Sequence, residues 1–403
     1  MTLNGKTVLL GVSGGIAAYK AAELVRLLVK EGASVHVVMT QNAQRFVTPL
    51  TFQTLSNNVV GTDIFSMESE SRISHIQKAR IPDLVIIAPA TANLMAKMCA
   101  GIADDYLTTI LLATTAPVLV CPAMNVRMWE HPATQRNLKV LTELGYQIEQ
   151  PATGSLACQE EGAGRLADIR DILERTVRML TPATLAGRRV LVSAGPTWEH
   201  FDPVRFIGNP SSGKMGYALA KVAIRRSAQV HLVSGPCCLG SLAGVERISV
   251  ISAQEMKDVI SDFSPHLDAI VMAAAVSDYR PAEKAPQKLK KQAAGSHQVL
   301  LEPNADILAG LGKAKPPHQV LVGFAAETEN VVENAKGKLV QKNLDFIVAN
   351  DLAQEGCGFG HDTNQVRIID RNGAVTNLPP MTKDEVASQI WDRVEQLLAG
   401  GKN

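Results

Sequence analysis

The sequence lacks a net charge and lacks any long apolar segment. Its 403 residues include 40 Lys and Arg against 39 Asp and Glu, a formal net charge of +1. This balance gives no general field to attract nucleic acid or an anionic membrane, so any anion must be bound by a local site. Charged residues at Lys97, Asp104 and Asp105 interrupt the most apolar region before it reaches the ~20 residues of a membrane span. We expect small-molecule substrates, no nucleic-acid partner and no membrane partner.

Paired cysteines and the usual metal-binding spacings are also missing. The six cysteines show no C-x-x-C spacing and do not cluster with histidines, which argues against a zinc site or a disulfide framework. The apolar stretch that begins at Val8 continues in helical phase without the small-residue cleavage site of a signal peptide. We therefore expect a cytoplasmic protein, and the residues of any metal site stay unknown at this stage.

What the sequence does contain is a repeated alternation of strand and helix. Residues 9–28, LLGVSGGIAAYKAAELVRLL, run from an apolar strand through a glycine turn into an amphipathic helix. Further apolar runs occur in ASVHVVMT, PDLVIIAPATANLMAKMCAG and APVLVCPAMN, and each ends in a polar or proline-containing loop. Strands that alternate with helices imply a parallel sheet whose carboxyl edge gathers the ligand-binding loops.

The pattern pauses once and then starts again. The pause is TPATLAGRR, and the restart is RVLVSAGPT, followed by a glycine-bearing loop, a helix and another strand. We therefore predict an α/β protein with two tandem Rossmann-like, doubly wound domains, at residues 1–180 and 190–403, joined by a linker at residues 181–189.

Three segments of the second half carry further local signals. The segment QVRIIDRNGAVTNLP predicts a hairpin turned on Asn372 and Gly373, and Thr382 with Glu385 predicts the capping box of a final helix that ends near Gly400. The segment RPAEKAPQKLKKQAAGSHQ has no apolar period, so we expect a mobile loop there.

The glycine turn of the first half does not have the G-x-G-x-x-G spacing of a dinucleotide site. The second strand ends in Met39 and Thr40, where such a unit carries an acidic residue for the ribose. These absences count against NAD. Ser13, Gly14 and Gly15 at a helix N-terminus can still offer N–H groups and a hydroxyl to a single phosphate. A mononucleotide such as FMN fits this turn better.

Three further segments of the first half carry a resemblance. They are SRISHIQKAR, APATANLMAKM and CPAMNVRMW. Together with the glycine turn they resemble the flavoprotein family of cysteine decarboxylases, which includes phosphopantothenoylcysteine decarboxylase, over residues 1 to about 175. The resemblance implies that FMN lies at the sheet edge between the subunits of a trimer. The residues that would hold it are Ser13, Gly14, Gly15, Thr40, Pro89, Thr91, Asn93 and Met124.

The same resemblance implies three catalytic residues. His75 would be catalytic, and Asn125 would hold the substrate carboxylate. Cys158, in the glycine-rich stretch GSLACQEEGAGRLAD, is similar to the family's proton donor, and this stretch is expected to be a mobile loop that closes over the substrate. Gln159 and Leu166 depart from the family pattern in this stretch.

The chemistry of the decarboxylation explains these needs. An N-acyl cysteine does not lose CO2 readily, because the resulting carbanion has nowhere to delocalise. If FMN first takes a hydride from the carbon that bears sulfur, the thioaldehyde becomes an electron sink and CO2 can leave. The remaining enethiolate must take back a hydride and a proton, which requires an acid.

The second half contains AGPTWEHFDPVRFIGNPSSGKMG, a plausible anion cradle of N–H groups, hydroxyls and charge ahead of a helix. It lacks G-x-x-x-x-G-K-[ST] and is therefore not a P-loop. With AAAVSDYRP, KLKK and GFAAET it resembles phosphopantothenate-cysteine ligase over residues 188–395, although Trp198 replaces the usual arginine and Gln287 an often-found glutamate. The whole chain is thus similar to the bacterial bifunctional enzymes of coenzyme A synthesis.

This second resemblance implies a CTP-dependent ligation of cysteine to 4'-phosphopantothenate. An acyl cytidylate would form with release of pyrophosphate and react with the amine of cysteine, with Mg2+ bridging the triphosphate. Asn209 would hold the acyl cytidylate, Arg205 would support it, and Lys288 would stabilise the transferring centre. The remaining substrate contacts implied by motif are Ser211, Ser212, Gly213, Asp278, Ala305, Asp306, Ile307, Leu308, Phe324, Lys338 and Lys342.

Three interpretations of the chain are open at this stage. In the first, the second domain makes 4'-phosphopantothenoylcysteine and the first domain decarboxylates it to 4'-phosphopantetheine. The chain would then form a homo-oligomer. By family resemblance the first domain packs as a trimer and the second as a pair, which together imply a dodecamer. The second is a tandem NAD(P) oxidoreductase. The third is a non-catalytic flavin-binding or regulatory protein, which would have no need of His75, Asn125, Cys158, Asn209 and Lys288 together.

Overall fold

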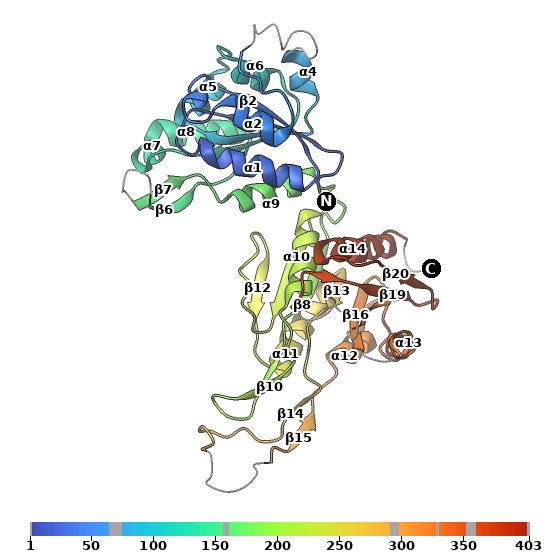
Figure 1. Ribbon diagram of the computed structural model, residues 1–403. Coiled ribbons are helices and arrows are strands. Elements are labelled where there is room, and N and C mark those ends of the chain that lie inside the picture. The colour runs from blue at the N-terminus through green and yellow to red at the C-terminus, as the bar shows by residue number, and fades with distance from the viewer. Residues whose placement is uncertain are drawn as a thin grey trace. The chain divides into compact units, whose positions relative to one another are not determined.

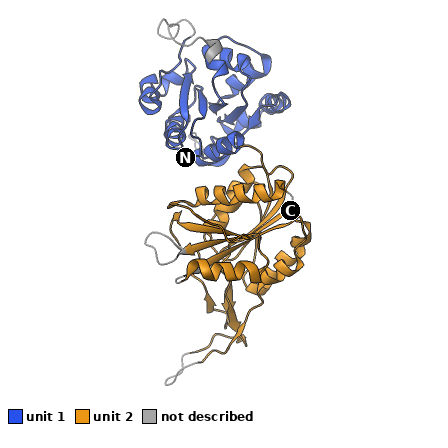
Figure 2. Cartoon of the chain, turned by 90° about the vertical axis from the view of Figure 1, so that its right-hand side faces the viewer, with its two compact units in different colours: residues 1–181 blue, residues 182–403 orange. Residues whose placement is uncertain are grey.

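The computed structural model describes residues 2–63, 75–155, 161–290, 298–327, 330–351 and 360–400. The chain divides into two compact units, residues 1–181 and 182–403, whose folds are seen in Figure 1 and Figure 2. Among the helices of the described residues, none has both the length and the apolar character needed to cross a membrane.

Unit 1 is built on a five-stranded sheet in which all neighbours run parallel, in the order β2-β1-β3-β4-β5. Its strands are β1 (Thr7–Val12), β2 (Ser34–Met39), β3 (Leu84–Ala90), β4 (Val118–Pro122) and β5 (Gln147–Ile148). β3 and β4 are buried along their whole length, because helices cover both faces of the sheet.

The helices of unit 1 bury their apolar stripes against opposite faces of this sheet, as Figure 1 shows. One face packs against α1 (Ala18–Lys30), α2 (Pro49–Ser56) and α9 (Ile169–Leu180). The other packs against α4 (His75–Arg80), α5 (Ala92–Ala100), α6 (Tyr106–Ala113) and α8 (Pro132–Glu143). Between these elements lie η1 (Ala43–Arg45) and α7 (Val126–Glu130).

The strand order of unit 1 creates a switch point between β1 and β3. The chain leaves β1 toward β2 on one side, and later strands are added on the other side, so the loops after β1 and β3 diverge. A crevice opens at such a point at the carboxyl edge of a parallel sheet, which is where this fold class binds ligands.

Unit 2 contains an eight-stranded sheet in the order β12-β11-β8-β13-β16-β17-β19-β20. The strands are β8 (Arg189–Ala194), β11 (Gln229–Ser234), β12 (Glu246–Ser249), β13 (Ala269–Met272), β16 (Val320–Glu327), β17 (Phe346–Asp351), β19 (Val366–Asp370) and β20 (Val375–Asn377). The strands from β12 to β17 are parallel, and β19 and β20 are antiparallel additions at one edge.

Helices cover both faces of this sheet as well. On one face lie α10 (Lys214–Arg225) and α14 (Lys383–Ala399), joined by the fully buried Trp391, whose indole N–H donates to the Leu219 carbonyl at 2.9 Å. On the other face lie α11 (Ala253–Phe263), α12 (Ile307–Ala314) and α13 (Val331–Gln341). Unit 2 also contains the short elements η2 (Ser264–His266), β18 (Thr363–Asn364) and β21 (Met381–Thr382).

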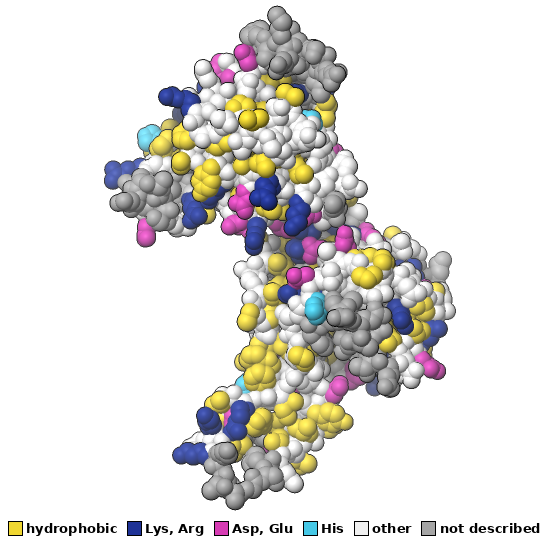
Figure 3. Space-filling view, in the orientation of Figure 1, with side chains coloured by type: hydrophobic (Ala, Val, Ile, Leu, Met, Phe, Trp, Pro, Cys, Tyr) yellow, Lys and Arg dark blue, Asp and Glu magenta, His cyan; other side chains and the backbone are white. Residues whose placement is uncertain are grey.

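Two short antiparallel ribbons extend unit 2 beyond the carboxyl edge of its sheet (Figure 1). One ribbon pairs β9 (Trp198–His200) with β10 (Phe206–Gly208), and the other pairs β14 (Tyr279–Pro281) with β15 (Leu301–Pro303). We call the described residues of these ribbons and their turns, 198–208, 279–290 and 298–303, the arm. The Trp198 ring stacks on Phe206 with centroids 4.1 Å apart. Figure 3 shows hydrophobic side chains gathered over this region.

Most of the predicted architecture is confirmed. Both units are Rossmann-like α/β folds, β19 and β20 form the hairpin turned on Asn372 and Gly373, and Thr382 and Glu385 form the capping box of α14. The stretch around Cys158, predicted as a mobile loop, is flanked by a short antiparallel ribbon that the sequence did not predict, in which β6 (Ala152–Ser155) pairs with β7 (Glu161–Arg165). Small residues in both strands hide any apolar alternation from the sequence. Leu185, inside the predicted linker, is buried in the core of unit 2.

Candidate functional site

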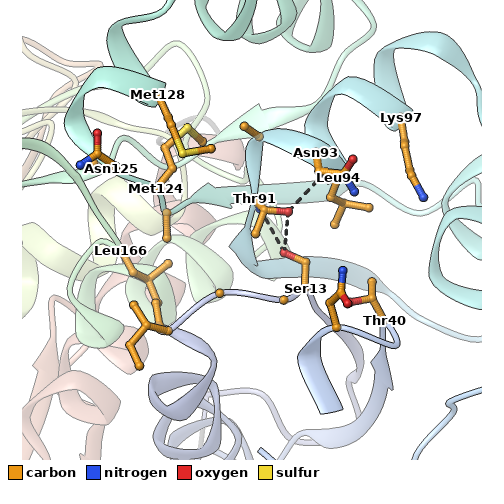
Figure 4. A pocket seen from close by; sticks show the side chains of 18 of the residues that line it. Ser13, Thr40, Thr91, Asn93, Leu94, Lys97, Met124, Asn125, Met128 and Leu166 are labelled. Atoms are coloured by element: carbon orange, nitrogen blue, oxygen red, sulfur yellow. Dashed lines mark hydrogen bonds between the residues drawn. The ribbon is translucent and has the colours of Figure 1, made fainter. Parts of the chain in front are cut away.

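Unit 1 has a cavity of about 970 Å³ at the carboxyl edge of its sheet, where the loops after β1, β3 and β4 meet (Figure 4). Pro89 is buried in β3 and does not line the cavity. The other predicted FMN contacts do line it, and so does the predicted catalytic Asn125. They are Ser13, Gly14, Gly15, Thr40, Thr91, Asn93 and Met124.

Ser13 and Thr91 lock the two loops of the switch point together. The buried Ser13 hydroxyl donates to the Pro89 carbonyl at 2.7 Å and accepts the Thr91 N–H at 3.0 Å, as the dashed lines in Figure 4 indicate in part. The Thr91 hydroxyl in turn caps α5 by accepting the Leu94 N–H. The Ser13 hydroxyl, expected from the sequence to face a phosphate, is thus used to fix the turn that carries Gly14 and Gly15.

The turn presents unpaired N–H groups to the cavity. Within the described part of the chain, the N–H groups of Gly14, Gly15, Ile16 and Ala17 donate to no protein acceptor. Helix α1 has neither a side-chain cap nor an acidic residue in its first turn. The positive end of the helix dipole and these donors therefore face the same place, which is the arrangement that binds a phosphate.

Gly14 is required by the close approach of two loops. A Cβ at this position would lie 2.4 Å from Cβ of Asn42 and 2.9 Å from its carbonyl carbon. A Cβ at Gly15 would meet only the Thr91 methyl at 3.5 Å, an ordinary contact. The spacing of the glycines therefore reflects contact with the loop after β2 as well as access to a ligand.

The opposite end of the cavity is formed by α7 and the β6–β7 hairpin. Asn125 caps α7 by accepting the Arg127 N–H on its Oδ1 at 2.8 Å. The Met124 N–H donates to the Gly164 carbonyl at 2.8 Å, and a Cβ on Gly164 would lie 2.5 Å from the Met124 carbonyl oxygen. The hairpin thus packs against residues 122–125, which we call the PAMN loop. Met124 and Met128 give this end of the cavity an apolar wall (Figure 4).

Sequence analysis did not assign to the site five charged residues that line the cavity: Lys20, Lys97, Asp104, Asp105 and Arg165. The Lys97 ammonium binds both carboxylate oxygens of Asp104 at 2.7 Å. Burial, and then the charge of Arg165, lower the pKa of Lys20. Lys20 and Lys97 lie on the helices that follow the two switch-point loops, so projecting those helices onto a wheel would have indicated them.

Two predicted catalytic residues cannot be placed in this cavity. His75 is the first residue of α4, and its side chain lies outside what the structure describes. Cys158 lies outside the described residues, between β6 and β7.

The predicted ligase residues of unit 2 cluster around the arm and the N-terminus of α10. The Asn209 amide group donates to the carbonyls of Ala275 and Val276 at 3.2 and 3.3 Å. Gly213, with φ of 78°, caps α10, whose first turn holds no acidic residue. Ser211 and Ser212 lie directly before it, so the serine-rich loop ends at a helix N-terminus as the sequence predicts.

The other predicted CTP contacts fall on two faces of the sheet. Asp306 caps α12 and pairs with the Lys342 ammonium at 2.8 Å, close to Leu308 and one turn from Lys338. Burial raises the pKa of the Asp306 carboxyl, but the hydrogen bond and charge of Lys342, together with the N–H groups of Ala309 and Leu308, outweigh it and lower that pKa. Phe324 packs against the opposite face, with α10 and α14.

Ala305 and Ile307 are the sequence neighbours of Asp306. The Asp278 carbonyl accepts the Asn304 N–H at 2.8 Å. Among the side chains that the structure describes, no group of three or more His, Cys, Asp or Glu is arranged to hold a metal ion.

Comparisons with known proteins agree with this division. A family model described as "Flavoprotein" matches residues 1–181, and one described as "DNA/pantothenate metabolism flavoprotein C-terminal domain" matches residues 185–398. The chain is 48% identical to the coenzyme A biosynthesis bifunctional protein CoaBC of Bacillus subtilis, over 98% of each chain. The chain belongs to the CoaBC family. It is also 44% identical to the protein of the same name from Escherichia coli, over 97% of this chain and 96% of that one.

Two solved structures are each similar to about half of the chain. The crystallised C-terminal domain of a CoaBC protein is 42% identical and covers 54% of this chain and 99% of its own, with a TM-score of 0.47. The FMN-binding protein AtHal3 is 35% identical and covers 43% of this chain and 95% of its own, with a TM-score of 0.38. Membership of the CoaBC family confirms the family predicted from the motifs and argues against a tandem NAD(P) oxidoreductase.

Proposed function

We propose that the chain catalyses two consecutive steps of coenzyme A synthesis. Unit 2 would join cysteine to 4'-phosphopantothenate at the expense of CTP, and unit 1 would decarboxylate the product to 4'-phosphopantetheine with FMN. The observation that carries the proposal is the cavity of unit 1, with its unpaired N–H turn, in a chain related along its length to CoaBC proteins. We assign decarboxylation to residues 1–180 and ligation to residues 190–403, with residues 181–189 as the linker.

The described residues of unit 1 fit FMN. The N–H groups of Gly14 and Gly15 would bind its phosphate, Thr40, Thr91 and Asn93 would contact its polar chain, and Met124 would contact its ring. When bound, a flavin supplies a group that accepts a hydride from the substrate and returns it.

The protein's own part in the decarboxylation is to hold the substrate and move a proton. Asn125 stands at the cavity wall with its amide fixed as a helix cap, so it can orient a carboxylate. Cys158 would deliver the proton to the product carbon, and His75 would be the third catalytic residue beside Asn125 and Cys158. The β6–β7 hairpin, whose strands flank Cys158 in the sequence, is bound to the loop that carries Asn125 through the Met124 N–H and the Gly164 carbonyl.

In unit 2 the chemistry builds negative charge on phosphate and acyl oxygens, so it needs cations and fixed donors. The N-terminus of α10 and the Lys288 ammonium would supply them, and Asn209 would hold the acyl cytidylate. The predicted CTP contacts Asp306, Lys338 and Lys342 would hold the nucleotide. Mg2+ would be bound largely by the triphosphate itself, since Mg2+ commonly keeps substrate phosphates and water as ligands.

A homo-oligomer is part of the same proposal. Ile16 and Tyr19 at the rim of the cavity are 62% and 61% exposed, and Leu300 on the arm is 78% exposed. Apolar surface of this kind is covered in many proteins by another subunit. Self-association of each unit would yield the predicted dodecamer, and a cytoplasmic location would supply its substrates.

The decisive experiment incubates purified protein with 4'-phosphopantothenate, cysteine, Mg2+ and CTP and follows both products by mass spectrometry. We expect 4'-phosphopantetheine and CMP from the wild type. Lys288→Gln should lose most of its ligation activity but still decarboxylate supplied 4'-phosphopantothenoylcysteine, and Asn125→Asp should accumulate that intermediate. Failure of the wild type to form either product, with CTP or ATP, would favour the non-catalytic flavin-binding interpretation.

A further inference from the structure

One stretch of the arm is fastened along another at several points. In the β9–β10 hairpin, the Phe201 carbonyl accepts the Ala285 N–H at 2.9 Å. Asp202 Oδ2 accepts the Leu289 N–H at 3.2 Å, and Arg205 Nη2 donates to the Leu289 carbonyl at 2.5 Å. Both backbone polar groups of Leu289 are therefore bound by a single pair of side chains from the hairpin turn.

This pair is itself rigid. The Asp202 side chain is fully buried and accepts the N–H groups of Val204 and Arg205, each at 2.8 Å. Its other oxygen accepts Arg205 Nε at 2.9 Å and Nη2 at 2.6 Å, a two-point charge-assisted contact. The Arg205 guanidinium also lies 5.4 Å from the centroid of the Phe201 ring.

The carboxylate is charged throughout the physiological range. Burial would raise the pKa of Asp202, but the N–H groups of Val204 and Arg205, the guanidinium and the Leu289 N–H outweigh it and hold the pKa well below its usual range. The Arg205 side chain is 45% exposed, but three of its contacts are internal, so its orientation is set by the protein.

We infer that Asp202 and Arg205 are positioning residues that place Lys288 for the ligation reaction by gripping the backbone of the adjacent Leu289. The inference rests on the function proposed for unit 2. Lys288 is exposed and belongs to a segment without regular secondary structure. A long flexible side chain on such a segment loses much conformational entropy when it meets a reacting group, and fixing the neighbouring backbone in advance lowers that cost.

The hairpin also connects Lys288 to Asn209, the other predicted catalytic residue of the ligase. Asn209 follows β10 directly, so the turn that grips Leu289 and the residue that would hold the acyl cytidylate stand at the two ends of one short strand. The spacing of Lys288 and Asn209 is then set by this strand and not by the substrate. Arg205, expected from the sequence to support the acyl cytidylate, would act on it through Lys288.

The test measures ligation by full-length Asp202→Asn, Arg205→Gln and Arg205→Lys variants, each also assayed for decarboxylation of supplied 4'-phosphopantothenoylcysteine. We expect Asp202→Asn and Arg205→Gln to lower kcat for ligation about 10- to 100-fold, as expected for a misplaced catalytic group. The KM for CTP should change less than about threefold, since the CTP contacts are elsewhere, and decarboxylation should be unchanged. Arg205→Lys should recover part of the loss, because lysine can reach one acceptor but not make the two-point contact.

A double-mutant cycle with Lys288→Gln separates positioning from general support of the fold. If Asp202 acts through Lys288, adding Asp202→Asn to Lys288→Gln should lower the residual rate less than about twofold. If the double variant instead loses ligation rate by the product of the two single-variant factors, the two residues act independently and the inference is overturned. Full ligation by Lys288→Gln alone would overturn it too, and would leave the two-step function standing if the wild type is active. An inactive wild type would instead remove the proposed function on which the inference rests.

Asp370→Asn is the matched control. Asp370 also accepts two backbone N–H groups, from Asn372 and Ala374 at 2.9 and 3.0 Å, and binds an arginine, Arg393, at 2.6 Å. It lies in the β19–β20 hairpin, which contributes no predicted ligase residue. We expect Asp370→Asn to lose about as much thermal stability as Asp202→Asn but to keep the ligation rate of the wild type. A loss of ligation in Asp370→Asn equal to that in Asp202→Asn would overturn the inference.

Discussion

At the scale of single residues, Gly14 makes the sharpest test of the flavin site. The methyl group introduced by Gly14→Ala would lie 2.4 Å from Cβ of Asn42, so the turn after β1 or the loop after β2 would have to move. Forcing an extra methyl into a packed site costs about 1–3 kcal/mol. We expect Gly14→Ala to weaken FMN binding about 10- to 100-fold, measured by titrating the apoprotein and following the change in flavin fluorescence.

The neighbouring glycine provides the comparison. A methyl on Gly15 would make an ordinary contact, 3.5 Å from the Thr91 methyl, and would leave the Gly15 N–H in place. Gly15→Ala should therefore weaken FMN binding much less than Gly14→Ala. Equal losses would mean that the turn binds its ligand in a way that the contact with Asn42 does not explain.

At the scale of elements, the proximity of Lys78 on α4 to His36 on β2 makes unit 1 sensitive to acid. Burial, and then the charge of Lys78, lower the pKa of His36 on β2. Burial also lowers the pKa of Lys78 on α4, whose ammonium lies 5.5 Å from the centroid of the Tyr106 ring. Below pH ~6.5 the unfolded chain binds a proton at His36 that the folded chain resists, so stability falls as the pH falls.

The corresponding measurement is the midpoint of thermal unfolding of unit 1 at pH 7.5 and pH 5.5. We expect the wild type to lose more stability over this range than His36→Gln does, because the substitution removes the titrating group. The exposed His318 of unit 2 supplies the control, since His318→Gln should leave the acid loss of unit 1 intact. A loss in His36→Gln as large as that of the wild type would contradict the assignment.

At the scale of the whole molecule, the two units have separate cores. Each buried apolar cluster draws its residues either from residues 1–181 or from residues 182–403. Calorimetry of the full chain should therefore show two transitions. Added FMN should raise only the transition of unit 1, by about 2.7 kcal/mol of stability at a concentration one hundred times the Kd. The Gly14→Ala variant should need more FMN for the same shift, and one transition that moves as a whole would contradict independent units.

Local sequence patterns were enough to predict the fold because each unit repeats them. Apolar runs such as that of β3 and the glycines after β1 determine strand and turn within a few residues. The β6–β7 hairpin escaped prediction because its strands, rich in glycine and alanine, carry no apolar alternation.

Contacts between distant residues could not be predicted in the same way. Ser13 and Thr91 lie 78 positions apart, and Asp202 and Leu289 lie 87 apart. Only folding brings the members of each pair together, so the sequence indicated that Ser13 and Arg205 matter but assigned their polar groups directly to ligands. The structure instead shows Ser13 holding Thr91, and Arg205 holding Leu289.

The bond between Ser13 and Thr91 also has a consequence for synthesis of the protein on the ribosome. A nascent chain that has emerged only through β2 has the glycine turn but neither β3 nor the Thr91 N–H that fixes Ser13. The turn proposed to bind the phosphate is therefore unfinished, although every residue of that turn has been made. Cofactor capture must wait until β3 has inserted beside β1, which places flavin loading after the centre of the first sheet has formed.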